Sequence, residues 1–180
     1  MELTLESLHR DHDNLRRILF LLEDLLIDIY RGSHHHNPVF QQILAYIQDY
    51  PERVHHPTED MIYSLLYKKG FSDDKLRKNL NSLLKDHSEI ENITRDTISI
   101  VERMQVDTYL DSEDFGTKIS DVIKRQRAHL LFEEMHIYPQ IAKYLDDEDW
   151  AEIATRIPAH EDPIFGSRIR KEYELIVKAL

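Results

Sequence analysis

The sequence predicts an all-α fold: an up-down-up-down four-helix bundle with additional C-terminal helices packed outside it. Glycine is scarce, with 4 in 180 residues, while Leu, Ile, Glu, Asp and Lys are plentiful, so most of the chain can be helical. Apolar residues recur at spacings of three and four along extended stretches. Clusters of turn-forming residues separate these stretches, so we expect long antiparallel helices.

The first helix is expected to begin after Thr4, a residue type that caps helix N-termini well, and to end before Gly32. Its inward stripe consists of Leu5, Leu8, His12, Leu15, Leu19, Leu22, Leu26 and Ile29. The other long helices are expected to show the same spacing. Their ranges are about 38–66, 73–104 and, from a start within 111–114, to at least 141.

The second of these helices contains Pro51 and Pro57. A proline inside a helix removes a backbone hydrogen bond and bends the axis. We therefore expect a kink or a short break at this point. The alternative is a loop that divides two shorter helices.

Two further helical segments are expected after residue 145. The acidic run 146–149 leads into a short helix with Trp150 and Ile153 as its apolar contacts. Asp162 and Pro163 form an N-cap and a first helical position, so a last helix should open there. We expect one domain over residues 1–180, with the bundle at about 4–145 and the extension at about 146–180.

Composition excludes several functions. The formal net charge is −11, from 23 Lys and Arg against 34 Asp and Glu, and no basic cluster dominates, so nucleic acid is not an expected partner. The absence of cysteine excludes disulfides and thiolate metal ligands. No apolar stretch approaches the ~20 residues of a membrane span, and no signal peptide is evident. We expect a cytoplasmic protein without a membrane partner; its oligomeric state stays open.

Four histidines occupy positions where the inward stripes otherwise carry apolar residues: His12, His55, His87 and His129. In an up-down bundle, residues equidistant from a turn lie at the same height. The midpoints between successive histidines fall between residues 33 and 34, at 71 and at 108, all within turn sequences. The spacing therefore places the four imidazoles in one layer.

Two glutamates accompany this layer. Glu59 follows His55 by four residues and Glu133 follows His129 by four, so each pair shares a helix face. Buried carboxylates need protons, solvent or cations. The four histidines with Glu59 and Glu133 form a ligand set for two divalent ions, with the glutamates placed to bridge.

The ligand chemistry narrows the metal. Nitrogen-rich ligation without thiolate disfavours structural Zn, Mg and Ca and leaves Fe, Mn or a dinuclear Zn site, of which we favour two Fe ions over Mn or Zn. No catalytic residue is assigned. Four residues near the ligands are candidates for supporting them, and the first is also a candidate additional ligand: Glu91, His56, Gln126 and His136.

The order and spacing of these residues resemble the hemerythrin-like, or HHE cation-binding, domain. Supporting details are His55-His56 before Glu59-Asp60, Asp86 before His87, and the run Phe132-Glu133-Glu134 before Tyr138-Pro139. The resemblance implies a non-haem di-iron centre, Fe–O–Fe or Fe–OH–Fe, bridged by the two glutamates and an oxygen atom. It also implies an open position where the small diatomic ligands O₂ or NO bind.

Two departures from the oxygen-carrying members stand out. Those proteins have a second histidine four residues after the third-helix ligand, where this chain has Glu91. They also have an Asp five residues after the fourth-helix histidine, where this chain has Glu133 at four. The set is closer to bacterial proteins implicated in iron–sulfur-centre repair, which often carry a cysteine-bearing segment; this sequence has no cysteine.

We therefore expect a di-iron protein that binds or senses O₂ or NO, or handles iron, rather than an enzyme. An iron–sulfur-centre repair protein is one alternative. A ferritin-like di-iron oxidase is another, because Glu52-x-x-His55 and Glu133-x-x-His136 have its ligand spacing. A metal-free helical interaction module is the third, in which the histidines are ordinary buried polar residues.

Overall fold

The computed structural model describes residues 4–31, 38–104, 112–157 and 161–180, and within these ranges the regular structure is helical. The elements are α1 (Leu5–Tyr30), α2 (Pro38–Ile47), the π-helix η1 (Gln48–His55), α3 (His56–Lys69), α4 (Asp74–Met104), α5 (Ser112–His136), α6 (Tyr138–Tyr144), α7 (Asp147–Arg156), the 3₁₀ helix η2 (Lys171–Tyr173) and α8 (Glu174–Ala179). The all-α prediction is confirmed, but the fourth long helix, expected to reach at least residue 141, ends at His136 and is followed by the separate helix α6. The turns expected near residues 33 and 108 lie outside the described residues.

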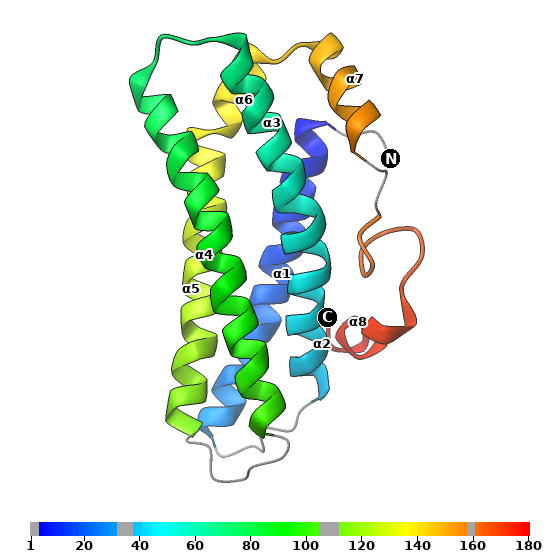
Figure 1. The fold of residues 1–180 in the computed structure, drawn as a ribbon. Coiled ribbons are helices and arrows are strands. Elements are labelled where there is room, and N and C mark those ends of the chain that lie inside the picture. Colours follow the sequence, from blue (N-terminus) through cyan, green and yellow to red (C-terminus); the bar gives the residue numbers. More distant parts are fainter. Residues whose placement is uncertain (1–3, 32–37, 105–111, 158–160) are drawn as a thin grey trace.

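Four long rods form the body of the molecule and alternate in direction: α1, the continuous α2–η1–α3 segment, α4 and α5 (Figure 1). Helix α5 packs against both α1 and α4. Helices α6 and α7 lie at one end of the rods, and α8 packs against α2 on the outside (Figure 1). None of the described helices combines the length and apolarity that crossing a membrane requires.

The start of α1 matches the expected cap. The Oγ1 atom of Thr4 accepts a hydrogen bond from the Ser7 backbone N–H at 3.2 Å, and the Ser7 hydroxyl accepts one from the Thr4 N–H at 3.0 Å. These two bonds satisfy donors that a helix N-terminus leaves without an intrahelical partner. Thr4 therefore sets where α1 begins, and with it the position of His12 along the helix.

Two apolar clusters hold the rods together. One includes Leu15, Leu19 and Ile43, and the other includes Ile62 and Leu80; these five side chains are at most 2% exposed. Fully burying one such side chain stabilises the fold by about 1.5–3 kcal/mol. The candidate metal ligands belong to neither cluster, so a polar layer interrupts the apolar core of the bundle.

The two prolines do not break the second rod. Pro51 has no N–H to donate to the carbonyl one turn earlier, and the chain forms the wider π-helix η1 across residues 48–55. The N–H of His56 then bonds to the carbonyl of Pro51, five residues back. Pro57 lies in the first turn of α3, a position at which helices tolerate proline. The alternative of a dividing loop is wrong: the irregularity takes the form of a π-helix.

The C-terminal segment begins differently from expectation. The short helix after the acidic run is confirmed as α7, which is capped reciprocally by Asp146 and Asp149. Asp162, however, caps a turn: its carboxylate accepts from the N–H groups of Ile164 at 2.8 Å and Phe165 at 2.9 Å. The prediction of a helix opening at Pro163 is wrong, because the bonds to Asp162 close this turn and α-helix returns only at α8.

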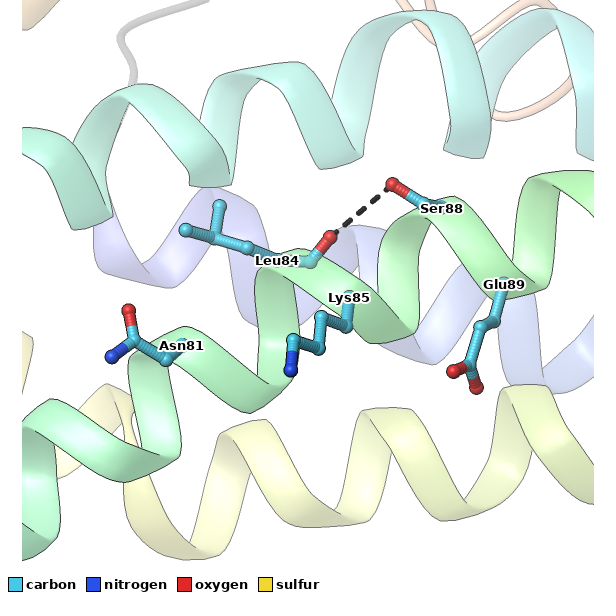
Figure 2. A pocket seen from close by; sticks show the side chains of 5 residues that line it. All are labelled: Asn81, Leu84, Lys85, Ser88 and Glu89. Atoms are coloured by element: carbon cyan, nitrogen blue, oxygen red, sulfur yellow. Dashed lines mark hydrogen bonds between the residues drawn. The ribbon is translucent and has the colours of Figure 1, made fainter.

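A shallow hollow lies on the outer face of α4, lined by Asn81, Leu84, Lys85, Ser88 and Glu89 (Figure 2). The Ser88 hydroxyl donates to the carbonyl of Leu84 at 3.3 Å and so bonds within the helix itself. The hollow includes none of the candidate metal ligands.

Candidate metal centre

The four histidines of the predicted layer come together inside the bundle, joined by a fifth. The ring centroids of His12 and His55 are 5.0 Å apart, and those of His87 and His129 are 4.8 Å apart. His56 stacks on His87 at 4.3 Å with an angle of 7° between the rings, and its centroid lies 5.3 Å from that of His129. Each of the five is at most 6% exposed, so the cluster is shielded from bulk solvent.

Both glutamates face this cluster from within it, and each is 0% exposed. The carboxylate oxygens of Glu59 lie 3.4 Å from Nε2 of His55, 3.6 Å from that of His12 and 3.7 Å from that of His87. Those of Glu133 lie 3.2 Å from Nε2 of His129 and 3.4 Å from those of His12 and His87. Each carboxylate therefore faces histidines from more than one helix, which is the position a bridging ligand needs.

The polar atoms at the centre fit a bound cation. The Nε2 atoms of four histidines and one oxygen of each glutamate are buried without a hydrogen-bonding partner: His55, His56, His87, His129, Glu59 and Glu133. Burying polar atoms without partners costs free energy, and metal ligation is one way to recover it. Imidazole nitrogens and carboxylate oxygens are common ligands of transition metals. The residues present therefore fit such an ion.

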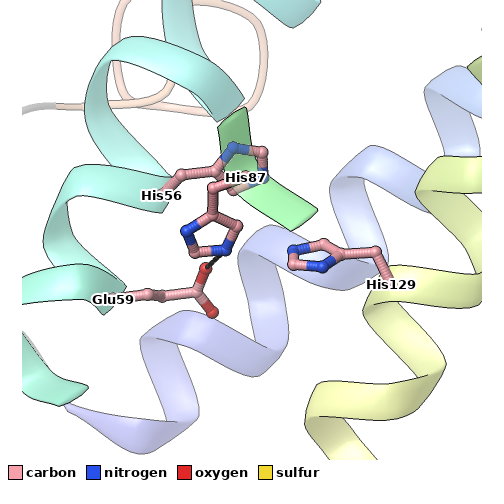
Figure 3. A group of neighbouring side chains, drawn as sticks. All are labelled: His56, Glu59, His87 and His129. Carbon is pink, nitrogen blue, oxygen red and sulfur yellow. Dashed lines mark ion pairs between the residues drawn. The ribbon is translucent and has the colours of Figure 1, made fainter. Parts of the chain in front are cut away.

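Two ligand groups can be distinguished by distance. The ligand atoms of His12, His55 and Glu59 lie within 4.8 Å of one another, as do those of His56, Glu59, His87 and His129. Figure 3 shows the second group, with His56 and Glu59 from α3, His87 from α4 and His129 from α5. Because Glu59 belongs to both groups, the arrangement suits two ions with a shared carboxylate.

Carboxylates behind the cluster orient three of the histidines. Nδ1 of His12 lies 3.0 Å from Glu134, that of His55 lies 3.3 Å from Asp11, and that of His87 lies 2.7 Å from Asp60. A carboxylate bound to one ring nitrogen leaves the other directed at the metal, and metal-binding histidines commonly have such a partner. These contacts explain why the Nε2 atoms converge.

These three carboxylates had no predicted role. Each is the sequence neighbour of a candidate ligand, yet each contacts a histidine on a different rod: Asp11 adjoins His12 and contacts His55, for example. Successive residues on a helix point about 100° apart, so the neighbour of an inward ligand faces the adjacent rod. A carboxylate immediately next to a candidate ligand in the sequence could therefore have predicted these contacts.

Two buried tyrosines were also missed. The Tyr63 hydroxyl donates to Glu133 at 2.6 Å, and the Tyr138 hydroxyl donates to Glu59 at 2.7 Å. The oxygen of Tyr138 also lies 2.7 Å from Nε2 of His12 and can accept a hydrogen bond from it. Each tyrosine fixes one oxygen of a glutamate and leaves the other free to face the histidines.

The electrostatics divide the histidines into two sets. Burial lowers the pKa of every histidine in the cluster, but facing carboxylates outweigh it for three of them. The pKa of His12 is raised well above its usual value, that of His55 to about 9 and that of His87 to about 10. Burial dominates for His56 and His129, whose pKa values are lowered. The facing carboxylates therefore favour the protonated form of these first three rings in the metal-free protein.

The carboxylates remain ionised in spite of their burial. Burial raises the pKa of Glu59, but His55 and His12 bring it well below the usual value. Burial and the neighbouring Glu59 raise the pKa of Glu133, and the surrounding histidines bring it to about 2. In the metal-free protein, the protons on the imidazoles balance the charge of the two glutamates. Bound cations can take the place of these protons.

The four residues expected near the ligands lie in different environments. His56 joins the cluster itself, and Gln126 is fully buried. His136 instead packs edge-on against Phe132, with ring centroids 4.9 Å apart. Glu91 is 57% exposed, 3.9 Å from Arg95. Glu91 is therefore not available as an additional ligand, because α4 turns it toward solvent.

Histidines and glutamates that converge in the core of a helical bundle are typical of metal-binding bundle proteins. The model of the hemerythrin HHE cation binding domain matches residues 3–141, which includes every residue of the cluster. The chain therefore belongs to the hemerythrin HHE cation-binding family. Comparison with curated proteins and with solved structures gave no significant match.

Proposed function

We propose that this protein binds two iron ions in a dinuclear centre and uses them to bind or sense O₂ or NO. The observation that carries the proposal is the pair of ligand groups that share Glu59 inside one buried cluster. Histidine and carboxylate ligands without thiolate suit iron, with Mn and Zn less favoured.

The residues divide unequally between the two ions. His12 and His55 would hold one ion, and His56, His87 and His129 would hold the other, with Glu59 and Glu133 between them. His56 serves here as a third histidine in place of one on α4, where Glu91 faces solvent. The ion with two histidines then keeps room for an exchangeable ligand.

The residues around the ligands would support the two bound iron ions. When bound, two iron ions supply an open coordination position and redox chemistry. The chain's part is to hold the carboxylates through Tyr63 and Tyr138, to orient the imidazoles, and to exclude bulk water with the apolar clusters. A buried site also strengthens every electrostatic interaction within it.

Metal content tests this proposal directly. Untagged protein from iron-replete cells, handled without oxygen, should contain about two irons per chain, as a dinuclear site requires. His55→Ala and Glu59→Ala should each lose at least one iron, whereas His136→Ala is the matched control because His136 packs on Phe132 outside the cluster. Full iron occupancy in both cluster variants would refute the proposal.

A second measurement separates binding from turnover. A stable O₂ or NO adduct of the iron-loaded protein supports the binding role. Continued O₂ consumption with added ferrous iron supports the ferritin-like oxidase instead. The position of His136 weighs against that alternative, because its ligand pattern needs His136 in the cluster.

A further inference from the structure

A second group of buried polar atoms lies beside the metal cluster and takes no part in it. Both side-chain atoms of Gln126, both carboxyl oxygens of Glu52 and the hydroxyl of Thr94 are buried with no partner in hydrogen-bonding geometry, although the Thr94 hydroxyl is close enough to Glu52 to lower its pKa. Gln126 is 0% exposed and Thr94 is 1% exposed. Buried polar atoms in native proteins are almost always paired, so five unpaired atoms on three residues call for a ligand.

The three residues lie on the same side of the histidine layer. Glu52 precedes His55 by three residues, and Gln126 precedes His129 by three, on rods that run in the same direction. Gln126 therefore lies about 4.5 Å before His129 along α5, and Glu52 lies on the same side of His55 within the π-helix. Thr94 follows His87 by two turns on the oppositely directed α4, which brings it to this side as well.

The chemistry of the atoms indicates what they bind. Burial raises the pKa of Glu52 to about 7, against the opposing effect of the nearby Thr94 hydroxyl. A carboxyl, a hydroxyl and an amide supply both donors and acceptors. A ligand must therefore donate and accept hydrogen bonds itself. An anion would be repelled by the carboxyl group in its ionised form.

A surface groove adjoins these residues. It lies between α2–η1 and α4, has a volume of about 370 Å³, and is lined in part by Gln48 and Ile98. Gln48 lies one turn before Glu52, and Ile98 lies one turn after Thr94. The groove therefore lies about one helical turn from Glu52 along the second rod and from Thr94 along α4.

We propose that Glu52, Thr94 and Gln126 form a binding site for small neutral hydrogen-bonding molecules, such as water and hydrogen peroxide, on their way between this groove and the metal cluster. The transit role rests on the proposed function, whereas the binding site itself does not. The site would select its ligands by hydrogen bonding.

Matched variants test the site. Thr94→Val and Gln126→Leu remove the polar atoms at nearly constant volume. Thr97→Val is the control, because Thr97 is equally buried on the same helix but its hydroxyl donates to its own helix at Ile93, 2.8 Å away. Circular dichroism and iron content verify that each variant folds and loads.

The first readout uses the metal-free protein. Nuclear Overhauser contacts between bound water and the Gln126 side-chain amide should be present in the wild type and in Thr97→Val, and weakened in Thr94→Val. Their absence from the wild type would overturn the binding site whether or not the protein holds iron. If Gln126→Leu does not fold, Thr94→Val alone decides.

The second readout is the rate at which hydrogen peroxide oxidises the ferrous, iron-loaded protein. Each peroxide takes one electron from each of two ferrous ions and, with two protons, becomes two waters. Thr94→Val and Gln126→Leu should react about three- to tenfold more slowly, the effect of one lost hydrogen bond on the path. Unchanged rates would overturn the transit role and leave the di-iron proposal standing; failure of the wild type to load iron would instead refute the di-iron proposal.

Discussion

The substitution Glu52→Gln should stabilise the metal-free protein, and more so at higher pH. Both carboxyl oxygens of Glu52 are buried without a partner, and burial raises the pKa of this group from 4.5 to about 7. Ionising it inside the bundle is unfavourable, because the effect of burial outweighs those of Thr94, Arg95 and Arg53, which favour the charged form. Glutamine has nearly the same shape and no charge to bury.

The magnitude follows from the two pKa values. Between pH 4.5 and 7 the unfolded chain has released this proton while the folded chain retains it, so stability falls as pH rises through this window and levels off above it. From pH 5.5 to pH 8 the loss from this one group is about 2 kcal/mol. The advantage of Glu52→Gln over the wild type should grow by the same amount.

Urea unfolding of both proteins, with chelator present, measures this difference. The histidine cluster titrates in both, so subtracting the two stability curves isolates Glu52. Asp24→Asn is the control for the loss of one negative charge, because Asp24 is exposed on α1. A Glu52→Gln advantage that is equal at pH 5.5 and pH 8 would refute the reasoning.

Three other changes should have separate effects. Asp60→Asn weakens the partner of His87 Nδ1 and should lower metal affinity about 10- to 100-fold in chelator competition; unchanged affinity would show that Asp60 does not orient this ring. Leu19→Ala removes a 0% exposed side chain and should cost about 2–5 kcal/mol in urea unfolding, and a cost below this range would mean that the core closes around the gap. Asp162→Ala removes the acceptor of the Tyr46 hydroxyl and of two backbone N–H groups. Limited proteolysis should then cut residues 161–180 faster while the bundle stays intact, and an unchanged cleavage rate would contradict this anchoring role.

The helices could be predicted from sequence because their causes are local. The stripe of α1 and the cap at Thr4 depend on residues within a turn of each other. The same holds for the cap of α7. The helix expected at Pro163 failed because the bonds to Asp162 close a turn instead, and a carboxylate with nearby N–H groups is equally typical of both structures.

The sequence by itself determined that four histidines and two glutamates face inward and that the histidines lie at one height. Helical spacing and a fixed rise per residue are enough for that inference. Only the tertiary structure decided which side chains meet across rods. The π-helix at Pro51 brings His56 into the cluster beside His55, and the turn of α4 directs Glu91 to solvent. Contacts such as that of Tyr63 with Glu133 join residues 70 positions apart, and packing, rather than local sequence, determines them.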